Sequence, residues 1–145
     1  MAEPVAVAVL DASVAVKLVV PEAGTAESLA IFEGPRRWLA PRLMVVEVAS
    51  ALRQKCEKEG LTTAEAAEAL AAILDAIADG IVDLADDEAL VQSALNLALT
   101  LGHKVPDCLY LALAEREGAL LASADRKLLA LARGRGIAVA EIPST

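Results

Sequence analysis

Short apolar runs alternate with longer segments of helical periodicity along this chain. The first run, residues 5–10, is wholly apolar and rich in β-branched side chains, which is typical of a strand buried on both faces of a parallel sheet. It ends at Asp11, and comparable runs recur further along the chain. We therefore predict strands at residues 5–10, 38–40, 81–84, 119–122 and 137–140.

Capping and stop residues predict helices between these strands. Thr62 and Glu65 have the spacing of a capping box, Pro41 suits the first turn of a helix, and Ser13 can cap another. The predicted helices cover residues 13–20, 25–34, 41–59, 62–79, 86–101, 106–118 and 125–133. This alternation indicates an α/β fold of three layers, α/β/α, with a short parallel sheet of four to five strands. No linker or repeat interrupts it, so we expect a single domain over residues 1–145.

Composition narrows the classes of function. Hydrophobic residues make up 57% of the 145 residues and aromatic residues 2%, which excludes disorder and a base-stacking platform. The longest apolar run, residues 108–114, is shorter than the roughly 18 residues of a membrane-spanning helix. The N-terminus also lacks the basic start of a signal peptide, so we expect a cytoplasmic protein with no membrane segment.

The net charge of −8 argues against a broad phosphate-binding surface, although an acidic protein can still act on nucleic acid through bound metal ions.

Two acids follow predicted strands, where the ligand site of a parallel sheet is expected. Asp11 and Asp125 follow apolar strand runs, and the ligand site of a parallel α/β sheet lies beyond the carboxyl ends of its strands. The alternative for each is an ordinary helix cap.

Two further acids occupy apolar surroundings. Glu47 has Leu43, Met44, Ser50 and Ala51 as its helical neighbours, so its carboxylate must be paired, protonated or bound to a cation. The alternative is a buried ion pair with an arginine, for which Arg42 and Arg53 are the candidates. Asp107 follows Pro106 at a helix start, ahead of an apolar run. The alternative to a role in a site is that Asp107 is an ordinary acid of the first helical turn, where the helix dipole favours a negative charge.

These four acids together predict a metal site. Carboxylates about 5 Å apart repel by about 3 kcal/mol per pair at an effective dielectric near 20, and a divalent cation offsets that repulsion. Oxygen ligands favour Mg²⁺ or Mn²⁺, while His103, the single histidine, cannot build a multi-histidine zinc site. Such a metal activates water and neutralises phosphate charge, so phosphodiester hydrolysis is the expected chemistry.

The ordered motifs of the chain resemble those of PIN-domain proteins, and specifically the VapC-type toxins of toxin-antitoxin pairs. The resemblance extends over nearly the whole chain. Its motifs are Val9-Leu10-Asp11-Ala12-Ser13, Glu47 within Val-Val-Glu-Val-Ala-Ser-Ala-Leu, Pro106-Asp107-Cys108-Leu109-Tyr110-Leu111-Ala112, and Ser123-Ala124-Asp125. The departures are Cys108, where Ala is frequent, and Ser123, where Thr is frequent.

The resemblance implies a PIN-like fold and a set of roles for these residues. By position, Asp11, Glu47, Asp107 and Asp125 match the family's metal-binding acids, with Ser13 and Ser123 as supporting hydroxyls. It also implies Mg²⁺- or Mn²⁺-dependent endoribonuclease activity on an RNA substrate, a homodimer, and a cognate antitoxin protein that blocks the site. Under this interpretation the basic residues after Asp125 contact phosphates. They are Arg126, Lys127, Arg133 and Arg135.

Two alternatives of other classes stay open. One is a catalytically silent PIN-like module that binds RNA or protein. The other is an acyl- or phosphoryl-transfer enzyme with Asp11 as nucleophile, but such enzymes need a second acid near position 13, where this chain has Ser13.

Overall fold

A five-stranded, wholly parallel sheet forms the centre of the computed structural model, which describes residues 6–145. Its strands are β1 (Ala6–Leu10), β2 (Arg36–Pro41), β3 (Val82–Ala85), β4 (Leu120–Ser123) and β5 (Val139–Glu141). Their order across the sheet is β3-β2-β1-β4-β5, and every neighbouring pair is parallel. The predicted parallel sheet is thus confirmed.

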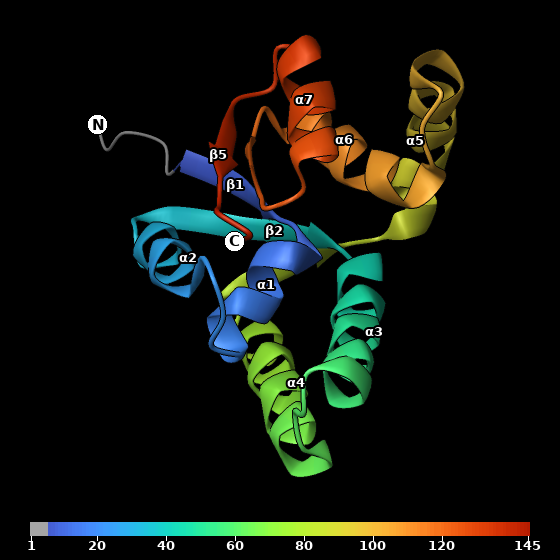
Figure 1. Ribbon diagram of the computed structural model, residues 1–145. Coiled ribbons are helices and arrows are strands. Elements are labelled where there is room, and N and C mark those ends of the chain that lie inside the picture. Colours follow the sequence, from blue (N-terminus) through green and yellow to red (C-terminus); the bar gives the residue numbers. More distant parts are fainter. Residues whose placement is uncertain (1–5) are drawn as a thin grey trace.

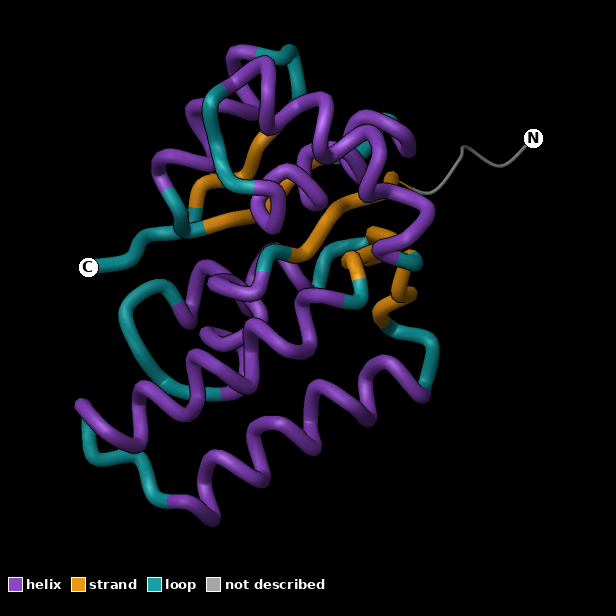
Figure 2. Tube along the Cα trace, turned by 90° about the vertical axis from the view of Figure 1, so that its right-hand side faces the viewer, coloured by secondary structure: helices purple, strands orange, loops and turns teal. Residues whose placement is uncertain are grey.

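Helices cover both faces of this sheet. They are α1 (Ala12–Val19), α2 (Thr25–Phe32), α3 (Leu43–Lys58), α4 (Thr63–Ala78), α5 (Asp87–Leu101), α6 (Val105–Glu117) and α7 (Arg126–Gly134). α1 to α4 lie on one face and α5 to α7 on the other (Figure 1), and the strands are sandwiched between the two groups when the molecule is turned (Figure 2). The predicted three-layer α/β/α architecture is therefore confirmed.

Local sequence signals account for most element boundaries. Thr62 and Glu65 form the predicted capping box at the start of α4. Gly118 ends α6 in the left-handed conformation, with φ of 59°, which glycine adopts without the steric cost of a Cβ atom. Two expectations were wrong. Pro41 is the last residue of β2 rather than the first turn of α3, and α1 begins at Ala12, so Ser13 lies inside its first turn rather than at the cap.

The predicted first strand included Val5, which lies outside the described residues. Within residues 6–145, no helix has both the length and the apolar character needed to cross a membrane.

Aliphatic side chains fill the core around two buried rings. Trp38 and Tyr110 are the largest fully buried side chains, and Leu10, Leu111 and Leu121 are buried with them. Each aliphatic side chain fully buried in this way contributes about 1.5–3 kcal/mol to folding. A core built mainly from Ala, Val, Leu and Ile, as the composition predicts, lets the helices pack closely on the sheet.

The order of the strands sets the place of the site. β1 is the central strand. β2 and β3 lie on one side of β1 in the sheet, and β4 and β5 lie on its other side. The carboxyl ends of β1 and β4 therefore meet where the strand order reverses, the usual ligand position in such sheets. The Asp11 amide donates to the Ala122 carbonyl at 3.1 Å, which joins the two strand ends directly.

Candidate functional site

Asp11 is buried at the end of β1, with 7% of its surface exposed. It occupies the N-cap position of α1, yet its carboxylate makes no capping hydrogen bond. Instead, Asp11 Oδ2 accepts from Ser13 Oγ at 2.6 Å and from Ser123 Oγ at 2.7 Å. Asp11 therefore stands at the cap position without capping the helix through its side chain, because Oδ2 accepts from hydroxyls of α1 and β4 and neither oxygen accepts from an amide of α1.

Asp125 is the cap of its helix. Its Oδ1 accepts from the backbone amides of Lys127 at 3.0 Å and Leu128 at 3.1 Å, so the first turn of α7 fixes the carboxylate. The Asp125 amide in turn donates to Ser123 Oγ at 3.0 Å, and the Ala124 amide donates to Ser13 Oγ at 3.0 Å. The two serines thus connect Asp11 to the Asp125 segment, although β1 and β4 are far apart in sequence.

Glu47 is half-buried on α3 and is hydrogen-bonded to a tyrosine. The Tyr110 hydroxyl, from α6, donates to Glu47 Oε1 at 2.5 Å. The expected arginine partners bind elsewhere: Arg42 pairs with Asp86 at 2.7 Å and Arg53 with Glu57 at 3.1 Å. The ion-pair alternative for Glu47 is therefore wrong, because a neutral hydroxyl takes the place of a cation.

Asp107 lies in the first turn of α6 and contacts His103. His103 Nε2 is 2.6 Å from Asp107 Oδ2, and Lys104 Nζ is 4.0 Å from the same oxygen. His103 lies in the loop between α5 and α6, and the sequence analysis did not indicate that it contacts one of the acids. Its spacing of four residues from Asp107 is the pattern that could have indicated this contact.

The charges of these acids influence one another. Burial raises the pKa of Asp11 above its usual value, the two serine hydrogen bonds oppose that rise, and the charges of Asp107 and Asp125 add to it. Burial likewise raises the pKa of Glu47, the Tyr110 hydrogen bond opposes the rise, and Asp11 and Asp107 add to it. Asp11 and Glu47 therefore each lie near enough to other acids of the site for those charges to disfavour their ionised forms, which is the electrostatic setting that a cation relieves.

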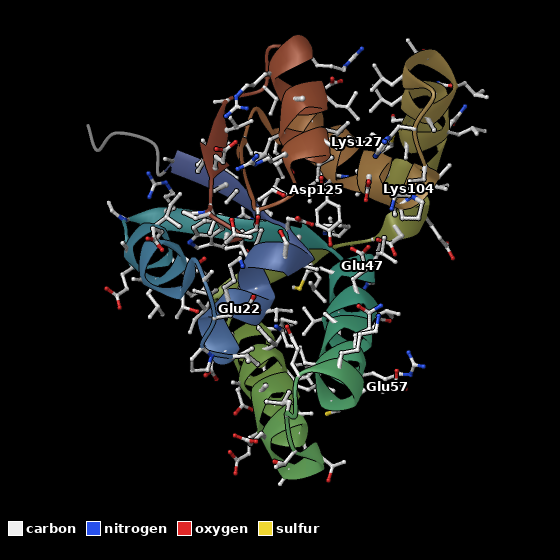
Figure 3. The ribbon with its side chains drawn as sticks, in the orientation of Figure 1. Glu22, Glu47, Glu57, Lys104, Asp125 and Lys127 are labelled. Carbon is white, nitrogen blue, oxygen red and sulfur yellow. The ribbon has the colours of Figure 1, made fainter. Side chains whose placement is uncertain are left out.

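One cleft of about 430 Å³ connects the four acids. Figure 3 shows Glu47 and Asp125 in the same region, with Lys104 at the start of α6, whereas Glu57 lies further along α3. Each carboxylate uses one oxygen for the contacts above. Within residues 6–145, no hydrogen-bond donor contacts the other oxygen, which is Oδ1 of Asp11, Oε2 of Glu47, Oδ1 of Asp107 and Oδ2 of Asp125.

This set of oxygens fits a hard divalent cation. Anionic oxygen ligands with no nitrogen or sulfur donor suit Mg²⁺ or Mn²⁺ better than zinc. In the described part of the chain, no three His, Cys, Asp or Glu side chains are drawn together tightly enough to enclose an ion as they stand. An ion bound by three or more of these acids would therefore require adjustment of their side chains.

The cleft also contains basic residues that the sequence analysis missed. Lys17 is buried, with 5% of its surface exposed, and its Nζ donates to the Ala23 carbonyl at 2.7 Å and to Glu22 at 3.2 Å. Lys55, on α3, pairs with Glu22 and with Glu59. The sequence pattern that could have indicated Lys17 is its spacing of four residues after Ser13, which places both side chains on one face of α1.

Cys108 stands beside Asp107 but is not a reactive thiol. Its side chain is buried, and burial raises the pKa of the thiol, with a further contribution from the charge of Asp107. The thiol therefore stays protonated, and its substitution for Ala changes packing rather than chemistry.

Comparisons with known proteins agree with this geometry. The family model of the PIN domain matches residues 8–134. PAE2754 from Pyrobaculum aerophilum is 23% identical, with a TM-score of 0.69 over 92% of this chain and 83% of that one. VapC20 from Mycobacterium tuberculosis, a toxin that cleaves the sarcin-ricin loop, is 15% identical, with a TM-score of 0.67 over 85% and 93%.

VapBC2 from Rickettsia felis, solved with a DNA fragment from its promoter, is 12% identical, with a TM-score of 0.60 over 94% of this chain and 98% of that one. No curated protein matches the sequence. At these identities the solved structures show a shared fold, and the family model spans most of the chain. The chain therefore belongs to the PIN-domain family.

Proposed function

We propose that this protein is a Mg²⁺- or Mn²⁺-dependent endoribonuclease and the toxin of a toxin-antitoxin pair. One observation carries the proposal: four carboxylates from separate segments line one cleft, and each keeps an oxygen with no donor among residues 6–145. Membership of the PIN-domain family supports it. VapC20, which shares the fold, is a toxin that cleaves the sarcin-ricin loop.

The proposed metal ligands are Asp11, Glu47, Asp107 and Asp125. Bound Mg²⁺ or Mn²⁺ would supply an activated water and neutralise charge on the attacked phosphate. Ser13 and Ser123 hold Asp11 Oδ2, and the first turn of α7 holds Asp125 Oδ1, so both side chains enter the site from restrained positions. Restrained ligands lose less conformational freedom when an ion binds.

Exposed basic residues beside the cleft are the proposed contacts for RNA phosphates. Lys104 lines the cleft, and Lys127 lies at the start of α7 next to Asp125 (Figure 3). Arg133 and Arg135, which the sequence analysis grouped with Lys127, pair with Glu141 and Glu115 instead. We therefore assign phosphate contact to the residues that begin α7 and not to those that end it.

The test is cleavage of structured RNA with and without divalent metal. Wild-type protein should cleave with Mg²⁺ or Mn²⁺ and stop when EDTA is added, and Asp107→Asn should abolish cleavage. Asp83→Asn is the matched control, because Asp83 is an exposed acid paired with Arg37 on the sheet and lies outside the cleft. Cleavage that persists in Asp107→Asn refutes the proposal, and RNA binding without cleavage in the wild type favours the silent binding module.

We also propose a homodimer, a cognate antitoxin and a cytoplasmic location. Two of the solved structures that share the fold are toxin-antitoxin assemblies, VapBC2 and a complex from Klebsiella pneumoniae, which supports a protein partner. For the homodimer we assign the outer face of α5. Val91, Leu95 and Leu99 lie on successive turns there and are 47%, 47% and 74% exposed.

A further inference from the structure

Tyr110 is the single tyrosine of the chain and is wholly buried, yet its hydroxyl contacts Glu47, a residue that lines the acidic cleft. Its ring packs in the core with the rest of α6, while the hydroxyl donates to Glu47 Oε1 at 2.5 Å. Position 110 lies one turn after Asp107 on the same helix, so one element carries both a cleft acid and the residue that contacts another acid.

The Tyr110 hydroxyl joins α6 to α3. It donates to Glu47 on α3, so this hydrogen bond connects the two helices that carry Asp107 and Glu47, two of the four acids. Burial, the charges of Asp11 and Glu47, and the hydrogen bond raise the pKa of Tyr110 well above its usual value. The hydroxyl therefore stays protonated and remains a donor to Glu47.

This contact distinguishes the two oxygens of Glu47. Tyr110 occupies Oε1, and within residues 6–145 no donor contacts Oε2. A glutamate side chain on a helix has several rotamers, and a hydrogen bond to one oxygen restricts both its rotamer and the orientation of its carboxylate. The partner of a metal-binding side chain commonly sets the affinity of the site in this way.

We propose that Tyr110 is a positioning residue for the metal site: it fixes the Glu47 carboxylate, so that Oε2 is the oxygen that binds the divalent cation. The proposal rests on the function proposed above. Tyr110 touches neither the cation nor the RNA, so it acts through Glu47 alone.

The test measures Mn²⁺ affinity of the full chain without RNA, by calorimetry or electron paramagnetic resonance. Tyr110→Phe should bind Mn²⁺ about 10-fold more weakly while keeping the wild-type circular dichroism spectrum. Ser28→Ala is the control, because it removes another buried hydroxyl, one without a hydrogen-bond partner among the described residues. This control should bind Mn²⁺ as tightly as the wild type.

A double-mutant cycle shows whether the effect passes through Glu47. In a Glu47→Ala background, Tyr110→Phe should cause no further loss of Mn²⁺ affinity. A full additional 10-fold loss in that background would mean that Tyr110 acts on the fold in general and would overturn the proposal. Unchanged Mn²⁺ affinity in Tyr110→Phe itself would overturn it as well, while leaving the nuclease proposal intact.

A measurement on the wild type keeps the test independent of how well Tyr110→Phe folds. Mg²⁺ saturation should shift the near-ultraviolet difference spectrum of the single tyrosine, because its acceptor becomes a metal ligand. The shift should be absent in Glu47→Gln and present in Glu57→Gln, an exposed glutamate of the same helix paired with Arg53. Mg²⁺ binding without a tyrosine shift refutes the role of Tyr110, whereas failure of the wild type to bind either ion refutes both proposals.

Discussion

At the scale of single residues, Asp11 is both the most buried of the four acids and a source of instability. Burial raises its pKa, and hydrogen bonds from Ser13 and Ser123 only partly oppose the rise. Burial in this position disfavours the ionised carboxylate, and a bound cation would offset that effect. Ionised Asp11 therefore costs folding stability in the metal-free protein, a common trade-off between function and stability.

The first prediction concerns pH. The folded protein holds the Asp11 proton more tightly than the unfolded chain, whose pKa is near 3.8, so ionisation of Asp11 lowers stability as pH rises through its raised folded pKa. In EDTA, Asp11→Asn should therefore raise the Tm relative to the wild type more at about pH 7 than at about pH 4. Thermal unfolding followed by circular dichroism measures both differences.

Added Mg²⁺ gives the control for this comparison. It should raise the Tm of the wild type and leave Asp11→Asn unchanged, because binding to the folded state alone stabilises it. In EDTA, a Tm advantage of Asp11→Asn over the wild type that becomes smaller as pH rises would contradict the account of Asp11.

At the scale of elements, α5 differs from the other helices in carrying an apolar stripe away from the core. Leu90, Ala94 and Leu97 are buried against the molecule, while Val91, Leu95 and Leu99 face outward four residues apart. The proposed homodimer assigns this exposed apolar stripe as its contact surface. Two copies related by a two-fold axis would bury the same stripe on each other.

The second prediction tests this face. Leu95→Glu combined with Leu99→Glu should convert the dimer to a monomer without lowering the Tm appreciably, because neither side chain belongs to the core. Light scattering coupled to size-exclusion chromatography measures the mass. Leu74→Glu, on an exposed position of α4, is the matched control and should stay dimeric. A wild-type monomer, or a double variant that remains a dimer, contradicts the assignment.

The sequence predicts those elements and site residues that are determined by contacts between residues close together in the chain. The capping box of α4 and the acids after β1 and β4 are local patterns, and the sequence indicates each of them. Pro41 was assigned wrongly because proline suits both a helix start and the end of a strand, and only the pairing of Pro41 with Ala85 decides between them.

The contacts of Glu47 and Asp107 were harder to predict. Tyr110 and Glu47 are 63 residues apart, and their hydrogen bond exists only because α3 and α6 approach each other at the end of the sheet. A pattern search for charge partners favours arginine, so it leads to Arg42 and Arg53 and passes over a neutral tyrosine. The burial of Lys17 was missed as well, because the spacing on α1 shows only that Lys17 shares a face with Ser13, whereas packing of neighbouring elements buries it.

At the scale of the whole molecule, the reversal of strand order gathers residues from most of the chain. Asp11 follows β1 and Asp125 follows β4, at neighbouring strand ends, while α3 and α6 bring Glu47 and Asp107 to the same cleft. The molecule carries a net charge of −8, which repels RNA at long range. Under the proposed function, a divalent cation bound at this one place would reverse the repulsion locally and allow an acidic protein to engage a phosphodiester.

The most direct test of this account is a crystal structure of the protein with Mn²⁺, in which anomalous scattering locates the ion. The account predicts an ion in the cleft within bonding distance, about 2.0–2.3 Å, of oxygens of Asp11, Glu47, Asp107 or Asp125, including the oxygens that contact no donor in the described chain. Saturating Mn²⁺ that leaves this cleft without an anomalous peak, or with a peak held by other residues, would contradict it.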